Sequence, residues 1–172
     1  DQMQAELQRM MLRLRYAQVP VVAAVRGLAL GGGCELALHC ARRVAHLESY
    51  MGLVEVGVGL LPGGGGLTHI ARQAAERAQT STGTDLLPFL SEGFKAAAMA
   101  TVSSSALESR QLGYLQTSDP IVPHKDELLH RGAARIGGQG GIAREPQPVA
   151  FDVDLERVGG EISPKDAGQP PV

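Results

Sequence analysis

The sequence has no tryptophan, and its 172 residues include only three phenylalanines and three tyrosines. The core must therefore be aliphatic, and an aromatic surface on which the bases of single-stranded nucleic acid could stack is not evident. The formal net charge is -2, with 16 basic and 18 acidic residues. Because nucleic-acid-binding proteins usually carry a clustered basic excess, we expect no nucleic-acid partner.

Long apolar runs are also missing, because no stretch of about 18 uninterrupted apolar residues occurs and the first residues lack the order of a signal peptide. We therefore expect no membrane span and a cytoplasmic location. Cysteine is scarce: Cys34 and Cys40 lie six residues apart within one predicted helix, where they point to different faces. We expect two buried free thiols rather than a disulfide.

The length and the composition, with 44% apolar and 20% charged residues, are typical of one globular domain. Short apolar segments typical of strands alternate with helical patterns, which predicts an α/β fold without an internal repeat. The expected helices are residues 1–17, 34–41, a short one from about 67, 86–99, 106–112, and one from 125 that Gly132 cuts short. The expected strands are 21–25, buried on both faces, and 43–46 and 50–53. Loops are expected at 27–33 and 57–66, with a weakly periodic polar segment over 68–84.

The composition changes after His130, because glycine and proline make up nearly a third of the last 42 residues. That share is typical of low-complexity or disordered sequence. We expect residues 131–172 to be an irregular tail that is disordered or arises from a shifted reading frame.

A run of three glycines opens one predicted helix, in "GLALGGGCELALHC" at residues 27–40. The first turn of a helix leaves backbone N–H groups unpaired at the positive end of the helix dipole, and glycine lets a ligand approach them closely. The run therefore predicts a site for an anionic or polarised oxygen. The alternative is a tight strand-to-helix turn that needs glycine only for its dihedral angles.

Two glutamates stand alone in apolar surroundings. Glu35 follows the glycines closely, where a carboxylate must be paired, protonated or functional. Glu55, in "MGLVEVGVGLLPGGGG", is the only charged residue between Glu48 and Arg72. Two such carboxylates suit a general acid and a general base, because burial and mutual repulsion keep one protonated near neutral pH. For Glu55 alone, the alternative is a solvent-facing position on a loop.

Other motifs predict no chemistry. Residues 57–62 place proline where a dinucleotide fingerprint needs its third glycine, and residues 63–68 lack the lysine of a P-loop, so no nucleotide cofactor site is expected. Cys34 and His39 diverge too far on one helix to form a nucleophile and its base. The remaining candidates follow no metal-ligand or nucleophile-elbow pattern and are expected to be structural, exposed or, for the serines, a loop and helix N-cap: His39, His46, His69, Ser103, Ser104 and Ser105.

With these features placed, "PVVAAVRGLALGGGCELALHCARRVA" and "YMGLVEVGVGLLPGGGG" resemble the core signature of the enoyl-CoA hydratase/isomerase (crotonase) superfamily. The segment "FLSEGFKAAAMATVSSSALESRQLGYL" is similar to the version fused behind a 3-hydroxyacyl-CoA dehydrogenase in bacterial bifunctional fatty-oxidation proteins. The resemblance implies a partial crotonase-like (ClpP/crotonase) ββα spiral with C-terminal helices. Residues 1–130 would be the C-terminal portion of this domain, and residues 131–172 the tail.

The family holds the thioester oxygen of an acyl-CoA with two backbone N–H groups. The resemblance implies that Gly32 supplies one of them at the start of the helix. Gly31 and Gly33 would permit the close approach, and Leu30 would belong to the substrate-binding segment. The other N–H group comes from a segment upstream of residue 1, so we expect a fragment whose isolated chain has little or no activity.

In hydratases of the family, two glutamates hold a water that adds across the α,β double bond. The resemblance implies that Glu35 activates this water and that Glu55 delivers a proton to the α-carbon, in the syn hydration of trans-2-enoyl-CoA to 3-hydroxyacyl-CoA during fatty acid β-oxidation. The presence of both favours a hydratase over the isomerases and hydrolases of the family. The chain is expected to bind no cofactor or metal, and NAD only if the full protein carries a dehydrogenase domain.

Acyl-CoA is the partner that the resemblance implies, together with other copies of the chain, because the family forms homo-oligomers. The alternative function is a noncatalytic fragment that binds acyl-CoA or associates with family partners. A third hypothesis is a glycine-rich anion-binding module unrelated to CoA, which would bind phosphate as well as the thioester.

Overall fold

In the computed structural model of the chain, one or more helices separate each described strand from the next, as the predicted α/β class requires. The structure describes residues 2–80, 85–137 and 150–153. Its elements, in chain order, are α1 (Gln2–Arg15), β1 (Val22–Leu30), α2 (Gly32–His39), β2 (Arg42–Gly52), the 3-10 helix η1 (Glu55–Val58), α3 (Gly66–Thr80), α4 (Leu87–Ala98), α5 (Ala106–Gln111), β3 (Ile121–Val122), α6 (Lys125–Gly137) and β4 (Ala150–Val153).

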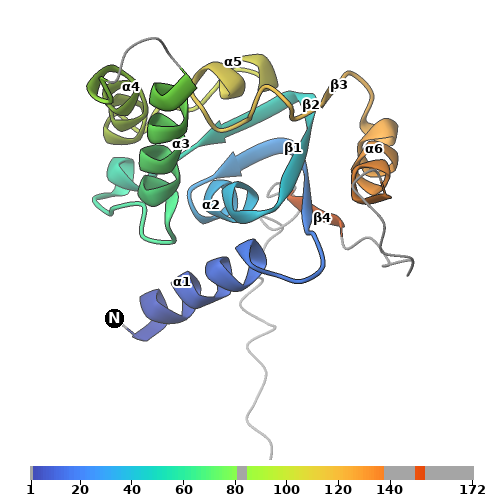
Figure 1. The fold of residues 1–172 in the computed structure, drawn as a ribbon, viewed down its shortest axis with the longest axis horizontal. Helices are drawn as coiled ribbons and strands as arrows, with labels where there is room; N and C mark the ends of the chain where they lie inside the picture. Colours follow the sequence, from blue (N-terminus) through green and yellow to red (C-terminus); the bar gives the residue numbers. More distant parts are fainter. Residues whose placement is uncertain (1, 81–84, 138–149, 154–172) are drawn as a thin grey trace, which may run out of the picture.

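A parallel sheet forms the centre of the molecule (Figure 1), and its described strands lie in the order β3-β2-β1-β4. β1 pairs with β2 from Val22 opposite Arg42 to Leu30 opposite Gly52. Because parallel neighbours cannot be joined by a hairpin, the chain crosses between them through α2. The carboxyl ends of β1 and β2 therefore lie together, and α2 begins at that edge of the sheet.

β1 is buried on both faces, as predicted. Val22 and Ala24 pack in one apolar cluster with Leu128 of α6. Ala23 and Val25, which alternate with them, belong to the larger cluster that includes the buried residues of α2. Successive side chains of a strand point to opposite faces, so one short apolar segment serves two packed layers.

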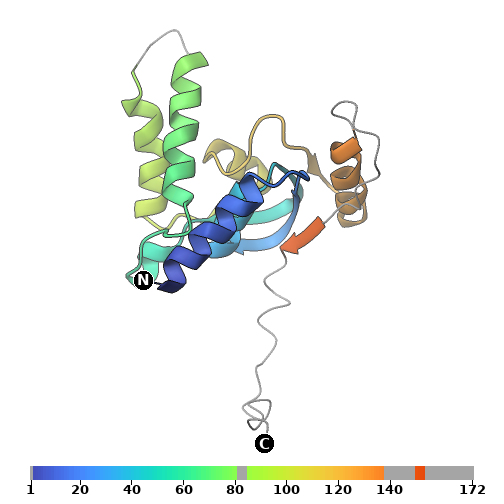
Figure 2. The same cartoon turned by 60° about the horizontal axis from the view of Figure 1, so that its bottom comes forward.

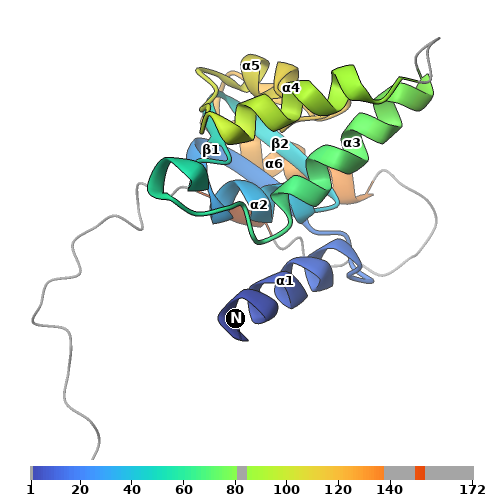
Figure 3. The ribbon, with the colours of Figure 1, turned by 90° about the vertical axis from the view of Figure 1, so that its left-hand side faces the viewer.

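The helices surround the sheet on several sides. α3 and α4 lie side by side on one flank, and α6 lies on the other (Figure 2). α1 packs against α2 away from the α3 and α4 pair (Figure 3), and its Met11 is buried. The predicted amphipathic helix is confirmed, although Met3 and Met10 of its apolar stripe are exposed. Within the described residues, no helix is both long and apolar enough to cross a membrane.

Two predicted boundaries in the sheet are wrong. β1 continues to Leu30 where a loop was expected from Gly27, and residues 43–46 and 50–52 belong to the single strand β2, which ends one residue before the predicted limit. The reason is the parallel ladder, which resumes from Gly27 opposite Ser49 after a register shift. Backbone pairing thus overrides the low strand propensity of glycine. The loop expected over 57–66 also begins within η1.

α3 is longer than the short helix that the sequence predicts. Its buried side chains include His69, Ile70, Gln73 and Ala74, which follow the spacing of one helical face. Two of them are polar, so the face does not appear as an apolar period in residues 68–84. α4 and α5 lie within one residue of their predicted bounds at both ends.

α6 does not end at Gly132, contrary to expectation. The helix runs to Gly137, and a Cβ placed on Gly132 would lie 3.8 Å from Val22 Cγ1, so the glycine lies close to β1. Within the expected tail, β4 pairs in parallel with β1, with Val22 opposite Ala150. The remainder of that expectation concerns residues outside the described ranges.

Candidate active site

The glycine run forms the turn between β1 and α2. Gly31 has φ +54°, a conformation that glycine adopts without strain, and its N–H donates to Gly52 O at 2.8 Å. The dihedral alternative is therefore right for Gly31, and its N–H is not free for a ligand. Gly32 and Gly33 lie in the first turn of α2, where the helix provides no acceptor for their N–H groups. A Cβ on Gly32 would meet nothing within 4 Å, so the space beside it is open.

Glu35 is held by backbone N–H groups from another part of the chain. The side chain is buried, at 2% exposure. Its Oε2 accepts a hydrogen bond from Gly64 N at 3.0 Å, and its Oε1 accepts one from Gly66 N at 2.8 Å. Of the three predicted states, pairing is the one observed. Each oxygen has its own donor, so the orientation of the carboxylate is fixed.

The glycines at 64 and 66 are needed for this close approach. A Cβ on Gly64 would overlap Glu35 Oε2, and one on Gly66 would lie 3.1 Å from Oε1 and 2.8 Å from Leu53 Cδ2. We did not predict Gly64 and Gly66 as partners of Glu35 from the sequence. The available signal was the run of four glycines at 63–66 after a proline, which we interpreted only as a loop without a P-loop lysine.

Glu55 lies beside the start of α2 and has no such support. Both carboxylate oxygens are buried and have no hydrogen-bond partner within the described part of the chain. Burial raises the pKa of Glu55, and the charge of Glu35 raises it further, while the nearby backbone of Glu55 itself acts in the opposite direction. The Cβ position of Gly31 lies 3.4 Å from Glu55 Oε1. The two predicted carboxylates therefore lie at the same end of α2.

The buried thiol of Cys34 and the buried phenol of Tyr114 stay in their neutral forms at pH 7. Cys34 is fully buried and burial raises the pKa of its thiol far above neutrality, so it is no nucleophile at pH 7. Tyr114 is buried, and its Oη accepts a long hydrogen bond from Leu53 N at 3.5 Å. Burial, with the nearby Cys34, raises the pKa of Tyr114 to about 12. Cys34 and Cys40 are both free and buried, which confirms the predicted absence of a disulfide.

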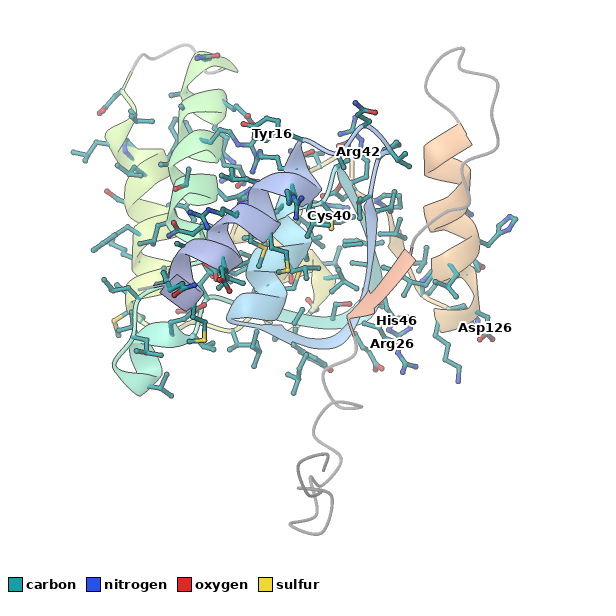
Figure 4. All side chains as sticks on the ribbon, turned by 90° about the horizontal axis from the view of Figure 1, so that it is seen from below. Tyr16, Arg26, Cys40, Arg42, His46 and Asp126 are labelled. Carbon is teal, nitrogen blue, oxygen red and sulfur yellow. The ribbon has the colours of Figure 1, made fainter. Side chains whose placement is uncertain are left out.

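The remaining candidates have structural surroundings. Ser105 caps α5 by accepting a hydrogen bond from Glu108 N, which confirms the predicted N-cap. His46, labelled in Figure 4 near α6, donates from Nε2 to Pro123 O at 3.0 Å. His69 is buried in the first turn of α3. No cluster of three or more histidine, cysteine, aspartate or glutamate side chains in the described ranges could hold a metal ion.

Comparisons with known proteins agree on one family. The family profile "Enoyl-CoA hydratase/isomerase" matches residues 1–83. A "Probable 3-hydroxyacyl-CoA dehydrogenase" of Bacillus subtilis (strain 168) is 43% identical over 123 residues, which is 72% of this chain and 15% of the relative. The chain thus spans a small part of this curated relative.

Solved structures have the same fold. An enoyl-CoA hydratase from Bacillus anthracis matches with a TM-score of 0.60 and 26% identity, over 80% of this chain and 47% of that one. A protein of Thermobifida fusca YX, solved in complex with CoA, matches with a TM-score of 0.61 and 26% identity, over 80% of this chain and 46% of that one. The predicted crotonase-like fold is confirmed, and the chain spans under half of both structures.

Proposed function

The chain belongs to the enoyl-CoA hydratase/isomerase (crotonase) superfamily, and we propose that it carries the two carboxylates and one oxyanion amide of a site that adds water to a trans-2-enoyl-CoA. The observation that carries the proposal is the pair of unlike carboxylates at the start of α2. Glu35 is fixed by two amides, whereas the buried oxygens of Glu55 have no partner in the described residues. The name of the Bacillus anthracis structure and the CoA bound to the Thermobifida fusca protein support an acyl-CoA substrate.

The first requirement of this chemistry is to stabilise the charge that develops on the thioester oxygen. The backbone N–H group of Gly32 is suited to this task. The N–H group lies in the first turn of α2, at the positive end of the helix dipole and beside open space. An N–H group aimed at a developing oxyanion stabilises the transition state more than the ground state. Gly32 is therefore the proposed donor, while the amide of Gly31 is taken by Gly52 O.

Each of the two glutamates carries out one of the two proton transfers. Glu35 takes a proton from water as the water oxygen bonds to the β-carbon, and Glu55 gives its proton to the α-carbon. The raised pKa of Glu55 favours the protonated form that this step needs. After the addition Glu35 carries a proton and Glu55 is ionised, so one proton passes from Glu35 to Glu55 through solvent before the next turnover.

The test is hydration of crotonyl-CoA, followed by the loss of its conjugated absorbance. We expect Glu35→Gln and Glu55→Gln each to lower kcat by roughly 100- to 10,000-fold, because each removes one proton-transfer group. Glu92→Gln, at an exposed position of α4, is the matched control and should leave kcat unchanged. Turnover that survives in both site variants contradicts the two-glutamate assignment.

Calorimetric titration with a saturated acyl-CoA separates the proposal from its alternative. Binding of the acyl-CoA without measurable hydration supports a noncatalytic acyl-CoA-binding function. Binding of inorganic phosphate as tight as that of the thioester instead supports a general anion site at the glycine run.

A further inference from the structure

We propose that His39 is a positioning residue for Glu35 and acts through Gly65, the residue between the two amides that hold the carboxylate. Its effect on catalysis rests on the proposed function, whereas its effect on the position of Glu35 does not. From the sequence we predicted only a structural or exposed histidine at this position.

His39 is fixed by its hydrogen bond to the backbone of Glu35. It is the last residue of α2, buried at 5% exposure, and its Nδ1 lies 2.8 Å from Glu35 O. A carbonyl oxygen only accepts, so Nδ1 is the donor in this bond. The imidazole is therefore anchored one helical turn after Glu35, with its far edge directed away from that anchor.

The far edge of the ring lies against Gly65. A Cβ on Gly65 would lie 2.8 Å from both Cε1 and Nε2 of His39, so the two groups are in direct contact. Gly65 has φ +113° and separates the two residues whose N–H groups donate to Glu35. Its dihedral angles set the directions of those N–H groups relative to one another. The ring thus limits movement at the residue that links the two hydrogen-bond donors.

Other contacts fix the two ends of the same loop. Gln8 of α1 donates from Nε2 to Gly63 O at 2.8 Å, and His69 N donates to Gly65 O at 3.0 Å as α3 begins. These contacts hold the loop between α1 and α3. Among them, the His39 ring is the side-chain group in contact with Gly65 itself, which makes it the sharpest place to test the coupling.

Two substitutions separate the hydrogen bond of His39 from its ring contact. His39→Asn keeps a donor near the position of Nδ1 and removes the far half of the ring, whereas His39→Ala removes both. His130→Ala, at an exposed position of α6, is the matched control. Thermal melting of each variant shows that it is folded, and if His39→Ala fails to fold, His39→Asn carries the test.

The first readout is amide hydrogen exchange and amide proton chemical shift at Gly64 and Gly66, measured by NMR on the full chain without substrate. We expect exchange at both amides to be about tenfold faster or more in His39→Ala and His39→Asn, with upfield shifts that report weaker bonds to the carboxylate. Wild-type exchange in His39→Ala, or wild-type exchange restored by His39→Asn, overturns the proposal.

The second readout is kinetic and separates this proposal from the proposed function. If the wild-type chain hydrates crotonyl-CoA, we expect kcat of both His39 variants to fall roughly 10- to 100-fold with little change in KM, because a misplaced base affects the chemical step. A fall in affinity alone overturns the positioning role. If the exchange pattern is as expected but Glu35→Gln hydrates crotonyl-CoA as fast as the wild type, the proposed function fails and the positioning role stands.

Discussion

The two carboxylates at the start of α2 differ in what surrounds them. Glu35 is enclosed by the glycine loop, with one amide donor for each oxygen. Glu55 lies in η1 with the exposed residues Val56 and Val58, and its buried oxygens have no partner in the described residues. A carboxylate that accepts two fixed donors keeps one orientation, whereas one without donors changes its protonation state more readily. The difference suits one group to placing a water and the other to delivering a proton.

The largest effect is expected from a substitution in the glycine loop that displaces the carboxylate of Glu35. Gly64→Ala places a methyl group where Glu35 Oε2 lies, so the carboxylate must move and lose a hydrogen bond. We expect kcat for crotonyl-CoA to fall about 100-fold or more, and the free energy of unfolding to fall by roughly 1 to 3 kcal/mol.

Gly57→Ala is the matched control in η1, the helix that carries Glu55. Its Cβ would lie 3.5 Å from Ala100 Cβ, which is an ordinary contact. We expect it to change the free energy of unfolding by no more than about 0.5 kcal/mol. Equal effects of the two substitutions on kcat would remove the distinction between the two regions.

Acid should lower the stability of the fold through His69, which lies in the first turn of α3 and donates from its backbone N–H to Gly65 O of the glycine loop. Burial lowers the pKa of His69 to about 3, aided by the cations Arg43, Arg72 and Arg15 and by His39. The unfolded chain therefore binds a proton near pH 6.5 that the folded chain does not. Stability from this group is present above pH 6.5 and is lost as pH falls toward 3, by an amount on the order of 3 to 5 kcal/mol.

His69→Gln, which does not titrate, is the reference for that measurement. Urea denaturation of both chains between pH 7 and pH 4 should show the wild type losing more stability than the variant. A wild-type slope no steeper than that of the variant means that His69 is protonated in the folded state.

The same chemical substitution should affect the stability of the two regions differently. Glu35→Gln turns one acceptor into an amide donor that faces a backbone N–H, so we expect a loss of about 1 to 3 kcal/mol at pH 7. Glu55→Gln removes an ionisable group without a hydrogen-bond partner in the described residues, so we expect unchanged or raised stability. Denaturant unfolding at pH 7 measures both, and a larger loss for Glu55→Gln would reverse the comparison.

The smallest effect expected is the dependence of stability on Glu55 at rising pH. Burial raises its folded pKa above 4.5, so the folded chain keeps a proton that the unfolded chain has released. The contribution of Glu55 is full below pH 4.5 and is lost as pH rises through the folded pKa. Between pH 4.5 and 7, the wild type should lose stability relative to Glu55→Gln, the opposite sign to the His69 effect. A difference that stays constant over this range would contradict the raised pKa.

The elements with an apolar period could be predicted from the sequence, and those whose buried groups are polar or glycine could not. α4 was predicted within one residue at each end because its apolar and alanine residues follow a helical spacing. In α3, His69 and Gln73 occupy buried positions and hide the same spacing. At Gly132, the helix continues against Val22 where an isolated glycine suggested an end.

The site was predictable where a side chain carries the signal. Glu35 and Glu55 are conspicuous because a carboxylate in an apolar segment needs a reason. The partners of Glu35 are the backbone amides of Gly64 and Gly66, and every residue but proline has such a group, so composition does not mark them. Their role depends on the loop lying against α2, which is a tertiary arrangement.

The lack of a partner for Glu55 in the described residues has a consequence for how a sequence of this kind can diverge. A substitution at Glu35 leaves at least one of the two loop amides without its carboxylate acceptor and costs stability. A substitution at Glu55 breaks no hydrogen bond of its side chain within the described residues. Residue 55 is therefore the position at which a descendant could exchange one reaction for another while the fold, and the oxyanion site beside it, are inherited unchanged.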